Sequence, residues 1–128
     1  MRILLDTHAF IWWDSAPNRL PAAVLDLCAD PDNTLLFSVA SAWEMQIKLQ
    51  IGKLRLAKAL AIIIEDQQRR NHIDVLPVTL AHVLALSTLP LHHKDPFDRL
   101  LIAQAAAEAA VVVTHDPIFK SYPVTVRW

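Results

Sequence analysis

The chain has 128 residues, of which 54% are hydrophobic, and its 12 basic and 13 acidic side chains give a net charge of −1. This length suits one domain with one hydrophobic core, so we expect a single domain. The near balance of charge excludes a protein that holds nucleic acid by net positive charge alone, because such binding would need a local basic patch or bound cations.

Hydrophobic periodicity and turn residues predict strands that alternate with helices along the chain. In chain order we expect a strand at 2–5, a helix at 20–29, a strand at 35–38, helices at 40–51 and 56–71, a strand at 75–78, helices at 80–88 and 96–110, and strands at 111–114 and 124–128. This alternation predicts a single α/β domain over residues 1–128, with a central parallel sheet of about 4–5 strands flanked by helices on both faces.

Rare residue types and short apolar runs narrow the function classes further. Gly52 is the only glycine, which excludes the glycine-rich phosphate loops of dinucleotide-binding proteins and P-loop enzymes. Cys28 is the only cysteine, so we expect neither a disulfide framework nor a cysteine zinc site. The opening apolar run stops at Asp6, and the run at 59–64 is far short of the roughly 18 residues of a membrane span. We therefore expect no signal peptide, no membrane segment and a cytoplasmic location.

Four acidic side chains fall at the same kind of place in the predicted fold. Asp6 directly follows the first strand, and Asp116 follows the strand at 111–114 after one residue. Glu44 and Asp98 lie near the start of helices. In open parallel sheets the carboxyl ends of strands and the amino ends of the following helices share one edge, where ligands bind. The acids could therefore converge into a site for Mg²⁺ or Mn²⁺, which prefer oxygen ligands.

Ordinary helix-start chemistry accounts for each acid taken alone. Asp95, Pro96 and Asp98 have the spacing of an N-cap, a proline at the first helical position and an acid at the third. The other local interpretations are a Ser41–Glu44 capping box, a Glu44–Lys48 surface pair, an N-cap at Asp116 before Pro117, and a simple turn at Asp6-Thr7. The set favours a shared site, because capping does not require four acids along one edge of a sheet.

Four sequence segments carry a resemblance to a known family. They are Leu4-Leu5-Asp6-Thr7-His8, Ser38-Val39-Ala40-Ser41-Ala42-Trp43-Glu44, the Asp-Pro-Phe-Asp-Arg segment at 95–99 with its helix, and Val111-Val112-Val113-Thr114-His115-Asp116. In this order and spacing they resemble PIN domains, and more closely the toxin components of bacterial VapBC toxin–antitoxin pairs. The resemblance covers nearly the whole chain.

The resemblance implies an activity, a site and partners. The activity would be that of a metal-dependent endoribonuclease, with Mg²⁺ or Mn²⁺ as cofactor, that leaves a 5′-phosphate and a 3′-hydroxyl. The family's acidic cluster would be Asp6, Glu44, Asp98 and Asp116, and Thr114 its supporting hydroxyl. The protein would form a homodimer and a complex with a VapB-like antitoxin. His115 departs from the arginine that is common before the last aspartate, which affects local charge and substrate contact.

The chemistry of phosphodiester hydrolysis suggests a role for each acid. Water has to become nucleophilic, and charge on the phosphate oxygens and the leaving alkoxide has to be stabilised, all of which a carboxylate-held divalent ion can do. We expect Asp6 and Asp98 to coordinate the ion directly, Asp116 and Glu44 to act through water, and Thr114 to hold a carboxylate or water. Crowded carboxylates repel, so at least one should have a raised pKa without metal.

Several basic and aromatic residues keep two interpretations. The run His92-His93-Lys94 is a basic lip for RNA phosphates or a solvated loop, and Lys48 and Arg99 contact phosphate or form salt bridges to the acids. Lys53 and Arg55 are further candidate phosphate contacts. The tryptophans Trp12, Trp13 and Trp43 are more typical of a core or an interface than of base stacking.

Two other functions are compatible with acids at strand ends but fit this chain less well. A receiver-type phosphotransfer module also clusters acids at strand ends, but this chain lacks a clear phosphorylatable aspartate after a central strand and a lysine after the last strand. A catalytically idle PIN-like binding module is disfavoured by the intact acid set. Residues 57–64 with Trp12-Trp13 supply excess apolar surface, which indicates a partner interface.

Overall fold

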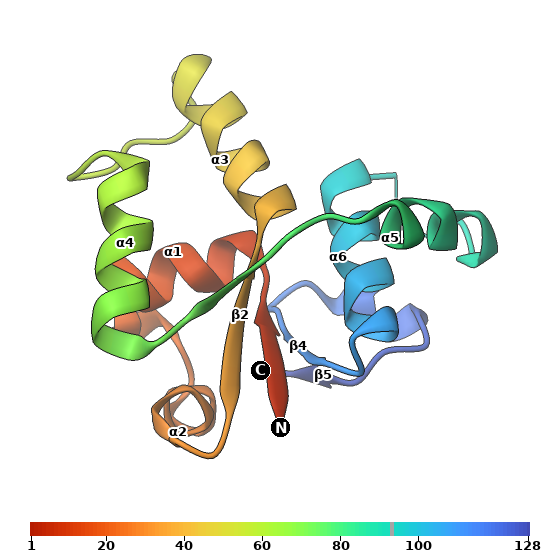
Figure 1. Ribbon diagram of the computed structural model, residues 1–128, viewed down its shortest axis with the longest axis horizontal. Helices are drawn as coiled ribbons and strands as arrows, with labels where there is room; N and C mark the ends of the chain where they lie inside the picture. The colour runs from red at the N-terminus through yellow and green to blue at the C-terminus, as the bar shows by residue number, and fades with distance from the viewer. Residues whose placement is uncertain (93) are drawn as a thin grey trace.

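The fold is a five-stranded, fully parallel sheet with helices on both faces (Figure 1). The computed structural model describes residues 1–92 and 94–128. The strands are β1 (Arg2–Leu5), β2 (Thr34–Ser38), β3 (Asp74–Leu76), β4 (Val111–Val113) and β5 (Val126–Arg127). They lie in the order β3-β2-β1-β4-β5. The predicted fold class is confirmed.

The helices largely follow the predicted pattern, with one addition. They are α1 (Thr7–Ser15), α2 (Ala22–Ala29), α3 (Val39–Gln50), α4 (Leu60–Asn71), α5 (Leu80–Ala85) and α6 (Pro96–Ala107), with 3-10 turns at Pro17–Arg19, Leu86–Thr88 and Pro117–Ser121. Helix α1 was not predicted. The helix expected at 56–71 begins only at Leu60, and the one expected at 96–110 ends at Ala107, because Ala109 adopts a left-handed φ of 51°. Gly52, with φ 76°, follows α3 as expected.

The sheet separates two hydrophobic layers, because successive side chains of a strand point to opposite faces. Ile3 and Leu5 of β1 pack in one layer, and Leu4 packs in the other. Helices α1, α2 and α4 cover the first face, whereas α5 and α6 cover the second (Figure 1). Among the described residues, no helix is both long enough and apolar enough to cross a membrane.

The strand order places a topological switch beside the central strand. The chain runs outward from β1 through β2 to β3, then returns to place β4 on the other side of β1. At such a switch the segments that leave the carboxyl ends of neighbouring strands diverge and open a crevice. The residues that leave these ends are Asp6 after β1, Val39 at the start of α3, and Thr114 after β4.

Candidate active site

One cavity of about 250 Å³ at this edge of the sheet gathers the acids. It is lined by Asp6, Thr7, His8, Glu44, Lys48, Asp95, Asp98 and Asp116. All four acids singled out in the sequence therefore line the same space, although they come from four separate segments. Thr114 lies beneath it, almost fully buried and hydrogen-bonded to Asp6. We call this space the acid cavity.

Asp6 and Glu44 are the two buried acids of the four, and only 6% of the surface of Asp6 is exposed. It is fixed from two sides, since its backbone N–H donates to Val113 O at 3.0 Å and its Oδ1 accepts from Ala9 N at 2.8 Å. The second contact makes it the N-cap of α1. The expectation of a simple turn at Asp6-Thr7 was therefore wrong, because a helix starts there.

Glu44 is held by a hydroxyl and an ammonium. Thr7 Oγ1 donates to Glu44 Oε1 at 2.7 Å, and Lys48 Nζ lies 2.6 Å from Glu44 Oε2. The Glu44–Lys48 pair anticipated from the sequence is confirmed. The Ser41–Glu44 capping box is wrong, because α3 starts at Val39 and Ser38 caps it by accepting from Ala40 N. Glu44 therefore sits in the second turn, where its side chain is free to face the cavity.

Asp95 and Asp116 each cap the start of a helix and also line the acid cavity. Asp95 accepts from the backbone N–H groups of Phe97 and Asp98, so the predicted N-cap is confirmed. Asp116 caps the 3-10 turn Pro117–Ser121 by accepting from Ile118 N at 3.0 Å. The acid cavity therefore lies at the start of two helical segments, whose backbone N–H groups partly offset its negative charge.

Burial and crowding raise the pKa of Asp6. Loss of solvation is the largest cause, and the nearby Glu44 carboxylate raises it further. The hydrogen bonds from Thr114 and Ala9 N, and the charge of His8, act in the opposite direction but do not cancel the effect. A carboxylate held this way favours any cation that enters the cavity, because the cation removes the charge imbalance.

The donor set suits a hard divalent cation. Every predicted ligand offers carboxylate oxygen, and Thr114 adds a hydroxyl. Among the described residues, no three Asp, Glu, His or Cys side chains already lie close enough together to hold one ion. Mg²⁺ commonly binds through one or two carboxylates and keeps several waters, so such a set is compatible with it.

The basic residues considered in the sequence take different places. Lys48 lines the acid cavity through its pair with Glu44. The guanidinium of Arg99 donates to the carbonyl oxygens of Leu86 and Pro90 and so anchors the segment before α6; the ion pairs of the described residues do not include the anticipated salt bridge. His92 is exposed and contacts Tyr122 edge-on, and His93 lies outside the described residues. The proposed basic lip at His92-His93-Lys94 therefore stays a prediction.

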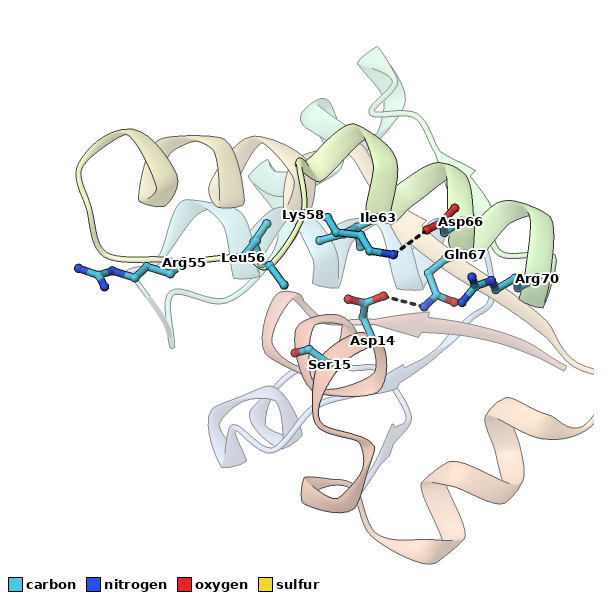
Figure 2. Close-up of a pocket in the computed structure, with 10 residues that line it drawn as sticks. Asp14, Ser15, Arg55, Leu56, Lys58, Ile63, Asp66, Gln67 and Arg70 are labelled. Carbon is cyan, nitrogen blue, oxygen red and sulfur yellow. Dashed lines mark hydrogen bonds and ion pairs between the residues drawn. The ribbon is translucent and has the colours of Figure 1, made fainter.

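A second cavity, of about 320 Å³, lies between the end of α1, the segment before α4 and α4 itself (Figure 2). Both of its carboxylates have partners: Asp14 Oδ1 accepts from Gln67 Nε2 at 2.8 Å, and Asp66 lies 3.5 Å from Lys58 (Figure 2). Arg55 lines this cavity, away from the acids. Because opposite charges compensate each other here, the acid cavity is the better candidate for chemistry, although it is smaller.

Three lining residues were missed as site residues in the sequence. Thr7 and His8 directly follow Asp6, and Asp95 was assigned only a capping role. Their position next to predicted acids was the available signal. Thr7 could be recognised only with α1 in place, because the helix turns its hydroxyl towards Glu44.

Comparison with known proteins gives consistent results. A family model described as PIN domain matches residues 3–124. Ribonuclease VapC22 of Mycobacterium tuberculosis (strain ATCC 25618 / H37Rv) is 29% identical over 129 residues, covering 97% of each chain. Among solved structures, VapBC2 from Rickettsia felis bound to a promoter DNA fragment matches with a TM-score of 0.75 and 19% identity over 99% of this chain and 98% of that one. VapBC-1 from nontypeable Haemophilus influenzae matches with a TM-score of 0.68 and 18% identity, over 99% and 97%.

Proposed function

The chain belongs to the PIN-domain family, and from that premise we propose that it is a Mg²⁺-dependent endoribonuclease that acts as the toxin of a toxin–antitoxin pair. One observation carries the proposal. Asp6, Glu44, Asp98 and Asp116 come from four distant segments and line one cavity at the carboxyl edge of a parallel sheet. The match to Ribonuclease VapC22 along nearly its whole length supports the ribonuclease assignment.

In this proposal Asp6 and Asp98 hold the ion directly, and Glu44 and Asp116 act through water. Mg²⁺, or Mn²⁺ in its place, would supply Lewis-acid stabilisation of the charge that develops on the phosphate. The contacts of Thr7 and Lys48 fix the Glu44 carboxylate, and Thr114 fixes that of Asp6. Preorganised groups of this kind reduce the cost of reaching the reactive geometry.

The cleaved bond follows from water as the nucleophile. Asp116 and Glu44 orient a water molecule for attack on phosphorus, and the bond from phosphorus to the 3′ oxygen breaks. The 3′ oxygen leaves and takes a proton, so the products carry a 5′-phosphate and a 3′-hydroxyl. The ribose 2′-hydroxyl takes no part as a nucleophile, which separates this reaction from metal-independent RNA cleavage.

The proposal is tested with purified protein and single-stranded RNA. We expect cleavage with Mg²⁺ or Mn²⁺, no cleavage with EDTA, and ends with a 5′-phosphate. Asp98→Asn should reduce the rate at least about 100-fold, because it removes a proposed ligand. Asp26→Asn, an exposed site on α2, should cleave like wild type. Cleavage that persists in EDTA, or that produces cyclic phosphate ends, would overturn the mechanism; an inactive wild type with both metals would support the idle binding module.

The proposed partners are a second copy of the chain and an antitoxin. Large apolar side chains are exposed on α3 and α5, where Trp43 is 60% and Leu80 72% accessible. The expected apolar surface is found only in part, because Ile62 in the 57–64 segment is 45% exposed whereas Trp12 and Trp13 are partly buried against the core. The solved neighbours are VapBC proteins, which supports an antitoxin partner for this chain as well.

Light scattering should show a dimer of the free protein, and co-expression with a short neighbouring reading frame should relieve toxicity. A monomer would count against the homodimer, and toxicity that persists on co-expression would count against the antitoxin.

A further inference from the structure

A second, wider hollow opens directly beside the acid cavity. It has a volume of about 460 Å³ and is lined by Asp6, His8, Trp12, His115, Asp116 and Pro117. Three of these residues, Asp6, His8 and Asp116, also line the acid cavity, so the two spaces share a wall. A ligand that fills one can therefore extend into the other.

The rings around this hollow form a connected array, which we call the aromatic shelf (Trp12, His115 and Trp128). The His115 and Trp128 rings are stacked, with centroids 4.9 Å apart and an angle of 20° between their planes. Trp128 in turn contacts Trp12 at 5.7 Å, and the guanidinium of Arg19 lies 4.6 Å from the Trp12 ring centre. Both tryptophans pack against the hydrophobic core, which fixes the position of the shelf.

We propose that the aromatic shelf binds a nucleobase of the RNA adjacent to the phosphate that occupies the acid cavity. This inference rests on the proposed ribonuclease function and specifies its substrate: RNA with an unpaired, unstacked base beside the cleaved bond. Bases inside a duplex cannot stack on a protein ring, whereas those of single strands and loops can. Stacking of a base on an aromatic side chain typically strengthens binding about tenfold or more.

The charge of the molecule favours this mode of binding. At a net charge of −1 the chain as a whole provides no net electrostatic attraction for the RNA backbone. Every base has a flat face, so stacking supplies affinity without positive charge and with little sequence preference. His8 and His115 are exposed at the rim, and Arg19 adds one cation behind Trp12. A purely structural role would explain why Trp12 and Trp128 pack on the core, but not why an open apolar hollow adjoins the acids.

The test compares variants on one single-stranded RNA oligonucleotide with a single cleavage site. We expect Trp12→Leu and His115→Ala to raise KM about tenfold or more and to change kcat less than about twofold. Trp12→Phe, which retains an aromatic face, should stay near wild type. Trp13→Leu is the matched control, because Trp13 is the next residue of α1 and packs on Phe10 rather than beside the hollow. Equal KM values for Trp12→Leu, His115→Ala and Trp13→Leu would overturn the inference, even if a protein partner then proved to bind the shelf.

A series of abasic oligonucleotides gives a readout that a folding defect cannot mimic. Removal of one base next to the cut should raise KM for the wild type but not for Trp12→Leu, since that variant has already lost the stacking contact. A base effect that persists in Trp12→Leu would overturn the inference. If the wild type cleaves no RNA, the proposed function fails and the shelf is tested separately: tryptophan quenching by the same oligonucleotide supports it if Trp12→Leu abolishes the quenching, and overturns it if not.

Discussion

Two clusters of polar side chains, the acid cavity and a network that joins Ser38 to Glu108, are built in opposite ways. In the acid cavity, the lining residues that the structure describes include five carboxylates, with Lys48 and His8 as their basic groups. The second group links Ser38, Gln104, His82 and Glu108. Ser38 Oγ donates to Gln104 Oε1, Gln104 Nε2 lies 3.3 Å from His82 Nδ1, and His82 Nε2 lies 3.1 Å from Glu108.

The difference lies in how donors match acceptors. In the Ser38–Glu108 network each donor meets an acceptor, so the polar groups offset the cost of their own burial. In the acid cavity the described lining residues include more carboxylates than basic groups, and burial, with a smaller contribution from the Glu44 charge, raises the pKa of Asp6. A buried polar cluster whose hydrogen-bond donors match its acceptors stabilises the fold. A cluster with an excess of carboxylates indicates a site where a bound cation supplies the positive charge.

The largest expected effect comes from Asp6→Asn, which should separate activity from stability. Asparagine still caps α1 but cannot carry the charge that a cation needs. We expect RNA cleavage to fall roughly 10²–10⁴-fold. In metal-free buffer the free energy of unfolding should rise by about 0.5–2 kcal/mol, because a buried charge is removed. Cleavage assays and urea unfolding in EDTA measure the two effects.

The pH dependence of that stability gain identifies its cause. Since the pKa of Asp6 is raised in the folded protein, the ionised carboxylate opposes folding at neutral pH. The cost disappears below the unfolded pKa of about 3.9, where Asp6 is protonated in both states. The advantage of Asp6→Asn should therefore be absent below about pH 4 and increase as the pH rises above the unfolded pKa. A gain that does not depend on pH, or a gain equal to that of the exposed Asp26→Asn, would contradict the electrostatic explanation.

The next largest effect should come from Gln104→Leu, with the opposite pattern. Gln104 is fully buried and joins Ser38 to His82, with a further hydrogen bond to Pro77 O. Its loss leaves buried partners unsatisfied, so unfolding free energy should fall by about 2–3 kcal/mol. Cleavage per folded molecule should stay within twofold. Urea unfolding and rate measurements test this, with the exposed Gln68→Leu as a control that should change stability by less than about 0.5 kcal/mol.

The sequence predicted the acid cavity far better than the Ser38–Glu108 network. Strand ends and helix starts can be located from local patterns, and a parallel sheet brings such positions to one edge. The positions of Asp6 and Asp116 followed from that rule. Nothing local links Ser38 to Gln104, which lies 66 residues later, so their contact depends on the packing of α3 against α6.

Helix α1 shows why some of the fold could not be predicted. Most of its residues are apolar, so no polar stripe with helical spacing marks it. Its starting signal, the Asp6 cap, was already assigned to a strand-end turn. Missing the helix also hid the role of Thr7, whose hydroxyl reaches Glu44 only in the helical geometry. The aromatic shelf was hidden for the same reason, since Trp12 belongs to α1.

The smallest expected effect comes from Ala109→Gly, at the end of the Ser38–Glu108 network. Ala109 directly follows Glu108, the C-cap of α6, and has a φ of 51°, which is strained for any residue with a side chain. Glycine relieves this strain, so unfolding free energy should rise by about 0.5–1 kcal/mol. Ala106→Gly, inside the last turn of α6, should instead lower it by a similar amount, because glycine weakens a helix interior. Urea unfolding of the two variants distinguishes strain relief from a general effect of glycine.

Both variants should cleave RNA like wild type. Relief of strain at Ala109 then stabilises without loss of activity, whereas relief at Asp6 abolishes it. If Ala109→Gly also reduced cleavage, the separation between a balanced structural network and an unbalanced functional cavity would no longer hold.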